Sequence, residues 1–235
     1  MTPVRLIDAT PVADDWRLIR LEWHGAAPSP GQWLWLDAGG DRHCLPVRDA
    51  DPQEGWLAGI VPGALSPDRL GPGVIANVSA IQGEAIQVSG DGPLIILGED
   101  LGIGPALAFA EHHAERTRLA LLGGQYGVPA TLVPSRFYVP ALADGAIAGI
   151  APLERQGVAA RVALGRDDRP GVYEGSVFEL LGRYLSETPA EFRQSLQIIA
   201  CGPWSALGQR RADLAASVGQ LQVVELPSAV RDSTP

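Results

Sequence analysis

The sequence predicts two structural units, an antiparallel β-barrel over residues 1–90 and a doubly wound α/β domain with a parallel sheet over residues 91–235. Three observations support this prediction. Short apolar or alternating segments, cut by Pro, Gly and Asp, fill the first ninety residues. A continuous apolar run then leads into a helical pattern after Pro93. Beyond it, apolar runs alternate with helical segments, which is typical of a parallel sheet covered on both faces.

The first unit contains five segments of strand character and no convincing helical pattern before residue 104. Two of them alternate polar and apolar residues, and the others are short and β-like. In chain order they are WRLIRLEW (16–23), GQWLWLDA (31–38), GWLAGIVPG (55–63), VIANVSAI (74–81) and EAIQVSG (84–90). Strands at this spacing favour a barrel or sandwich. We expect the indoles of Trp33 and Trp35 to point to opposite faces, so that at most one of them faces any given site.

The second unit alternates strands with helices. The segment PSRFYVPAL (134–142) is ambiguous, and AIAGIAPLERQG (146–157) holds a strand and a short helix. The predicted strands are LIILG (94–98), RLALLGG (118–124), VAARVALG (158–165), LQIIACG (196–202) and LQVVELP (221–227). The predicted helices are GPALAFAEHHAER (104–116), GSVFELLGRYLSETPAEF (175–192) and PWSALGQRRADLAASVG (203–219).

Composition excludes several classes of function. The net charge is −9 and all 18 basic residues are Arg, so we expect no binding to nucleic acid and no Lys-based phosphate loop. No apolar run is long enough for a membrane span, and the first residues lack the pattern of a signal peptide. We therefore expect a cytoplasmic protein with no membrane partner. The only cysteines, Cys44 and Cys201, cannot form a four-cysteine metal or iron–sulfur site.

Three glycine-containing loops follow strands of the predicted sheet, at residues 98–105, 123–127 and 201–203. Ligands of doubly wound sheets bind at these carboxyl ends. In the first loop Glu99 and Asp100 stand where a phosphate-binding loop normally has glycine. Two carboxylates within about 6 Å of a diphosphate would repel it by about 1 to 3 kcal/mol per close pair. They could instead cap their own helix, and a tight strand-to-helix turn explains the glycines equally well.

The order of three motifs resembles the ferredoxin reductase superfamily. PGQWLWL is similar to its barrel strand PGQF/Y-V-x-L, LIILGEDLGIGPALAF to its dinucleotide loop G-G-x-G-I-x-P, and IIACGPWSAL to its C-G-P-x-x-M segment. A closer resemblance is to the electron-transfer subunit of dihydroorotate dehydrogenase, carried by GVAARVALGRDDRPGVYEGSVFELL (157–181). The resemblance implies a flavoprotein, with FAD on the barrel and NAD(P)H on the second domain, that passes electrons to a redox partner protein or subunit.

The resemblance also implies site residues. For the nicotinamide dinucleotide these are Gly98, Gly102, Ile103, Gly104, Pro105, Gly202 and Pro203. Cys201 would lie beside the nicotinamide as the catalytic position, although a buried cysteine at a strand end is as often inert packing. For FAD they are Pro46 and Arg48, and a solvated turn explains Arg48, or Arg42, equally well. Gln125 stands where the family often has an Arg for a 2′-phosphate, so we expect NADH rather than NADPH.

The sequence also departs from the family pattern. Cys44 and Leu45 precede Pro46 where the family has its flavin-phosphate Arg, and Arg48 replaces the Ser that faces the flavin ring. The cysteine-rich segment of the dehydrogenase subunit has no counterpart, so we expect no iron–sulfur cluster in this chain. Two hypotheses follow. The first is an NAD(P)H-dependent flavoprotein oxidoreductase. The alternative is a non-catalytic binding or regulatory protein that has lost one or both cofactors.

Overall fold

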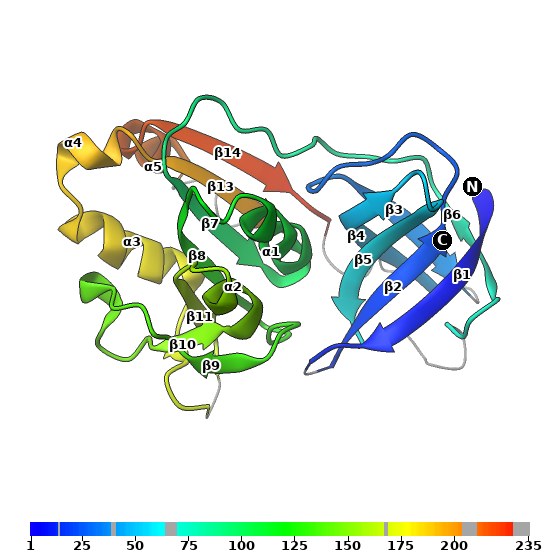
Figure 1. The fold of residues 1–235 in the computed structure, drawn as a ribbon, viewed down its shortest axis with the longest axis horizontal. Coiled ribbons are helices and arrows are strands. Elements are labelled where there is room, and N and C mark those ends of the chain that lie inside the picture. The colour runs from blue at the N-terminus through cyan, green and yellow to red at the C-terminus, as the bar shows by residue number, and fades with distance from the viewer. Residues whose placement is uncertain (14, 39–40, 64–69, 167–168, 204–210, 228–235) are drawn as a thin grey trace.

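The computed structural model describes residues 1–235 except 14, 39–40, 64–69, 167–168, 204–210 and 228–235. It confirms the predicted fold class: a closed antiparallel barrel stands beside a parallel sheet flanked by helices (Figure 1). The barrel ends with a strand at Val78 and the sheet begins at Leu94, so the predicted boundary at residue 90 falls in the connecting segment. None of the helices among the described residues is long and apolar enough to cross a bilayer.

Six strands close the barrel in the order β1-β2-β5-β4-β3-β6. The sequence analysis missed β1 and β4, and the strand that it predicted at 84–90 is an extended connection. The missed β4 contains Pro46, a residue that disfavours a central strand. The bounds are β1 Thr2–Pro11, β2 Trp16–Glu22, β3 Trp33–Ala38, β4 Asp41–Asp51, β5 Trp56–Pro62 and β6 Ile75–Val78.

The prediction that Trp33 and Trp35 face different sides of the barrel strand is wrong. Their rings meet edge to face with centroids 5.2 Å apart. Side chains alternate along a strand, so residues two apart share a face. Both indoles therefore lie on one side of β3.

The parallel sheet has the order β12-β11-β8-β7-β13-β14. Its strands are β7 Leu94–Glu99, β8 Thr117–Gly124, β11 Ala160–Leu164, β12 Tyr173–Glu174, β13 Gln197–Gly202 and β14 Gln220–Glu225, and β9 Leu132–Pro134 pairs with β10 Ala148–Ile150 in a small separate sheet. The helices are α1 Ile103–His112, α2 Ala151–Arg155, α3 Val177–Glu187, α4 Ala190–Arg193 and α5 Arg211–Ser217. Residues 204–210 of the predicted helix 203–219 lie outside the described residues.

The helices divide between the two faces of the sheet. α3 begins with a capping box, in which Ser176 and Glu179 exchange side-chain to backbone hydrogen bonds, and its apolar residues pack on one face. Pro189 follows, so the predicted helix 175–192 divides into α3 and α4. α1 packs on the other face, and eight of its ten residues are buried.

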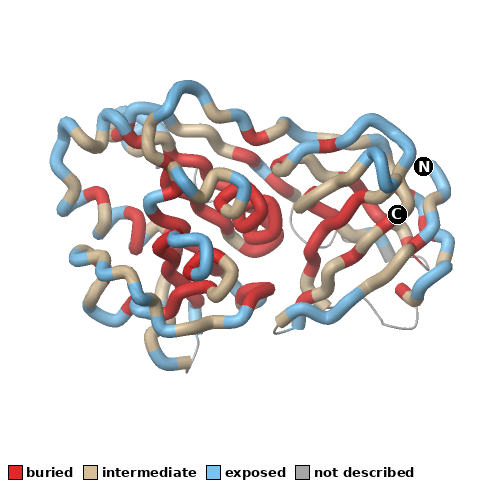
Figure 2. Tube along the Cα trace, in the orientation of Figure 1, coloured by how far each residue is buried: buried red, intermediate tan, exposed pale blue. Residues whose placement is uncertain are grey.

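One apolar cluster continues from the barrel interior through α1 to the sheet. Figure 2 shows this as buried trace in both units and along α1 between them. The contact is close where Ile60 of β5 meets Gly104, because a Cβ on that glycine would lie 3.5 Å from the Ile60 Cβ. The two units therefore share a core.

The connecting segment is also fixed in place. It runs along β14 in Figure 1. The Gln222 side chain accepts from the Gln87 N–H at 2.9 Å and donates to the Ala85 carbonyl at 3.1 Å, while the Ser89 hydroxyl donates to Gln220 at 2.6 Å. These bonds hold the linker to the last described strand of the sheet.

Candidate functional site

The strand order of the sheet reverses between β7 and β13. The chain leaves β7 toward β8 on one side and later returns to β13 on the other, so their carboxyl ends form the topological switch point. Gly98 and Cys201 are direct partners in this strand pair. The structure therefore brings together the first loop and the Cys201–Gly202–Pro203 segment, as the sequence analysis expected of a site.

The glycines of the first loop are used for packing within the chain. A Cβ on Gly102 would lie 1.9 Å from the carbonyl oxygen of Cys201, and one on Gly98 would lie 2.8 Å from the Cβ of Ala106. Contacts this short are impossible, so both positions require glycine. The α1 N-terminus thus packs closely against the end of β13.

Asp100 ties the first loop to the second. Its carboxylate accepts a 2.7 Å hydrogen bond from the Gln125 N–H, and its backbone adopts a φ of +48°, which Asp tolerates better than most residues. The side chain is 9% exposed. Burial raises the pKa of this carboxyl, while the Gln125 and Tyr126 backbone N–H groups oppose the increase. Asp100 therefore does not cap α1, which has no side-chain cap.

Glu99 is a half-buried carboxylate beside it. Burial, and secondly the charge of Asp100, raise the pKa of Glu99 to about 6. A perturbed carboxyl at the switch point of such a sheet marks a candidate functional group, although structural clusters show the same effect.

Cys201 is fully buried at the end of β13. Burial raises the pKa of its thiol to about 12, so the thiol stays protonated at neutral pH. The reactive form of cysteine is the thiolate, so its environment here is that of a packing residue. Its assignment to a position beside a nicotinamide stays a prediction.

On the barrel side, Arg48 lies at an irregularity in the pairing of β4 with β5, between Val47 and Asp49. Such bulges re-aim a side chain. Here the guanidinium meets Glu111 of α1 at 3.0 Å. Both side chains are about one-quarter exposed or less. Arg48, which the resemblance assigns to FAD, is therefore paired with the other unit, a partner that the sequence could not reveal.

The surfaces assigned to the two cofactors are covered by the protein itself. Ligand sites are usually pre-formed, so a chain without its ligand exposes the atoms that contact it. Of the assigned residues only Pro203 and Arg48 are partly exposed; Pro46, Gly98, Gly102, Ile103, Gly104, Pro105, Cys201 and Gly202 are buried. Most of the assigned residues are thus buried in this structure, and their assignment to a flavin or a dinucleotide stays a prediction.

A small cavity remains between the two units. Its volume is about 270 Å³, below the roughly 300 to 1,000 Å³ of ordinary ligand sites. Arg48 and Ile60 line it from the barrel, and Leu107, Glu111 and Arg155 line it from the other unit. A dinucleotide would not fit into it. Among the described residues, no group of three His, Cys, Asp or Glu side chains could hold a metal ion.

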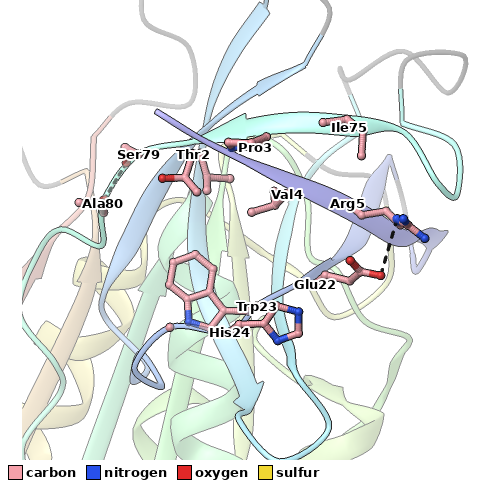
Figure 3. Close-up of a pocket in the computed structure, with 12 residues that line it drawn as sticks. Thr2, Pro3, Val4, Arg5, Glu22, Trp23, His24, Ile75, Ser79 and Ala80 are labelled. Carbon is pink, nitrogen blue, oxygen red and sulfur yellow. Dashed lines mark hydrogen bonds and ion pairs between the residues drawn. The ribbon is translucent and has the colours of Figure 1, made fainter.

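Two larger cavities lie elsewhere. One of about 440 Å³ lies beside Phe137, Tyr138 and Tyr184. The other, about 500 Å³, lies on the barrel and includes Trp23 and His24 (Figure 3). The sequence analysis identified neither, because each joins segments that are distant along the chain.

The fold is that of ferredoxin reductase-like FAD/NAD-binding proteins. The Amycolatopsis cytochrome P450 reductase GcoB superposes with a TM-score of 0.67 at 16% identity, over 94% of this chain and 68% of that one. An NADH-dependent reduced ferredoxin-NADP oxidoreductase gives 0.65 at 16%, over 97% and 77%. The FAD/NAD-binding domain of nitric oxide dioxygenase from Vibrio cholerae gives 0.63 at 12%, over 94% and 98%. No protein-family model and no curated protein matches the sequence.

Proposed function

We propose that this chain is a non-catalytic protein with a ferredoxin reductase-like fold, acting as a binding or regulatory protein whose cofactor surfaces are occupied by its own residues. The observation that supports this most is the burial of the switch point, where Gly102 packs on the Cys201 carbonyl and Asp100 bonds to Gln125. The Arg48–Glu111 ion pair supports it independently on the barrel side.

A second candidate is an NAD(P)H-dependent flavoprotein that passes electrons to a redox partner. The comparisons favour it, since structures of this fold over nearly the whole chain include a cytochrome P450 reductase and a ferredoxin reductase of carbazole dioxygenase. Under this candidate FAD would bind the barrel near Pro46 and Arg48, and NADH would bind near residues 102–105.

Flavin binding separates the two candidates. The purified chain is incubated with excess FAD, desalted and examined by visible absorbance, while NADH binding is measured by calorimetry. We expect a colourless protein and no heat of NADH binding. Flavin bands near one equivalent per chain after desalting would overturn the proposal and support the second candidate.

The double variant, Glu99→Gly with Asp100→Gly, gives a second test of the same question. If the carboxylates alone keep a dinucleotide out, the double variant binds NADH measurably. We expect no binding, because the backbone contact between Gly102 and Cys201 remains in the variant. A thermal unfolding curve establishes that the variant is folded before the titration.

A further inference from the structure

The largest of the three cavities is a groove on the side of the barrel that faces away from α1. Residues 2–5 of β1 form one wall, residues 22–25 at the end of β2 form another, and Ile75 and Val78 of β6 form a third. In the ring of six strands β1 lies three steps from β4, the strand against which α1 packs, so the groove is opposite the interdomain contact. Its volume of about 500 Å³ is in the ordinary range for small-molecule sites.

The groove originates in the strand pairing. β1 pairs with β2 from Pro11, opposite Arg17, back to Leu6, opposite Leu21. The register of this pairing is irregular between Leu6 and Asp8. Before that point β1 pairs with β6, from Thr2 opposite Val78 to Arg5 opposite Ile75. A bulge of this kind bends a strand, and here β1 diverges from the end of β2 and leaves a gap. The opening thus results from the course of the backbone and not from small side chains.

Two aromatic rings line the groove and are held in place. The Trp23 indole N–H donates a 2.9 Å hydrogen bond to the Ala26 carbonyl, and the ring lies over Gly25, where a Cβ would be 3.1 Å away. The His24 ring lies over Gly55, where a Cβ would be 3.2 Å away. Figure 3 shows both rings beneath β1 in this view. Fixed rings lose little conformational entropy when a ligand stacks on them.

The polar groups of the groove define the rest of its chemistry. Arg5 and Glu22 form an exposed ion pair of 3.7 Å at one end, where the two opposite charges offset each other. The His24 imidazole has no hydrogen-bond partner among the described residues, and its ring nitrogens can donate or accept. Val4 and Ile75, whose side chain is 60% exposed, supply apolar walls.

We propose that this groove binds a small, uncharged planar aromatic molecule that stacks on Trp23 and hydrogen-bonds to His24. Aromatic pairs are stabilised beyond the area that they bury. The volume suits one ligand of this kind and not a folded partner. The proposal does not depend on whether the interdomain surfaces bind cofactors, because none of the groove residues belongs to them.

The test uses the full chain and 2-naphthol as the probe, a planar aromatic molecule with one hydroxyl. Decahydro-2-naphthol is the matched control ligand, with the same skeleton and no aromatic ring. Binding is followed by saturation-transfer NMR and by titration. The variant is Ile75→Glu, which places a charge in the groove wall, and the control variant is Ile147→Glu, at a residue of similar exposure in the other unit.

We expect the wild type and Ile147→Glu to bind 2-naphthol equally, and Ile75→Glu to bind it about tenfold more weakly or worse. His24→Phe, which keeps a ring but loses the hydrogen bond, should weaken binding about fivefold. Failure of the wild type to bind, equal binding by Ile75→Glu, or equal binding of the saturated ligand overturns the proposal. So does a dimer in the wild type that Ile75→Glu converts to a monomer, because the groove would then be an interface. None of these outcomes depends on whether the protein binds flavin.

Discussion

The Trp16 indole N–H donates a 2.7 Å hydrogen bond to the Tyr126 carbonyl, 110 residues later in the chain and in the other structural unit. Trp16 is 1% exposed at the start of β2. With the Arg48–Glu111 ion pair, this bond joins the barrel to the α/β unit by two polar contacts beside the shared apolar core. Two domains of one chain usually move relative to each other unless the interface between them is large and apolar.

Trp16→Phe should lower the free energy of unfolding by about 2 to 3 kcal/mol. The change removes a buried hydrogen bond and leaves both a small cavity and an unpaired carbonyl. Urea unfolding at equilibrium measures it. Trp56→Phe is the matched control, because the Trp56 indole bonds only to the exposed Glu54 side chain. An equally large loss of unfolding free energy in Trp56→Phe would show that the hydrogen bond to Tyr126 does not account for the effect.

Gly102→Ala and Gly104→Ala should differ sharply in stability, although only one residue separates them. A Cβ at 102 collides with the Cys201 carbonyl, whereas one at 104 makes an ordinary contact with Ile60. We expect the first variant to lose about 3 kcal/mol and the second to change by about 1 kcal/mol or less. Thermal and urea unfolding compare them. Equal stabilities would contradict the packing role given to Gly102.

Arg48→Ala, Glu111→Ala and the double variant form a mutant cycle across the two units. Because the pair is only partly exposed, we expect a coupling free energy of about 1 kcal/mol, which decreases as salt is added. Urea unfolding of the four proteins at low and high salt gives this quantity. A coupling free energy near zero at low salt would mean that the ion pair does not help to hold the two units together.

Glu99→Gln should stabilise the folded chain relative to the wild type by an amount that grows as the pH rises. The pKa of Glu99 is raised from 4.5 to about 6 in the folded chain, so its contribution to stability is fully present below pH 4.5 and is lost as the pH rises through 6. At acid pH Glu99 is protonated and neutral like Gln, so we expect the variant to match the wild type there. By about pH 7.5 the variant should be more stable than the wild type by about 1 kcal/mol, a value kept small because the side chain is only half buried. A constant difference at all pH values would contradict the shift.

The α/β unit could be predicted in detail because its strands are continuous apolar runs between recognisable helices. The barrel was less predictable. β4 carries charged residues at both ends and Pro46 inside it, and its strand character comes from pairing with β3 and β5. The segment 84–90 alternates like a strand, yet its partners are the Pro30 carbonyl and the side-chain amide of Gln222 in β14.

The candidate site shows a different limit of sequence analysis. A glycine that lets a phosphate approach and a glycine that lets another strand approach look the same in a sequence. Gly102 is of the second kind here, since the Cys201 carbonyl occupies the space that a side chain would fill. Likewise, the pairing of Arg48 with Glu111 depends on a bulge and on the docking of α1, and both are tertiary features.

The connecting segment that lies along β14 has a consequence for synthesis on the ribosome. Gln87 and Ser89 bond to residues that are made 135 and 131 positions later. All six barrel strands precede Gln220 and Gln222. The barrel can therefore close, with the Ile86 N–H bonded to the Pro30 carbonyl, before Gln87 and Ser89 have their partners in β14. The hydrogen bonds that fix Gln87 and Ser89 to the sheet therefore form late in translation, once β14 has emerged.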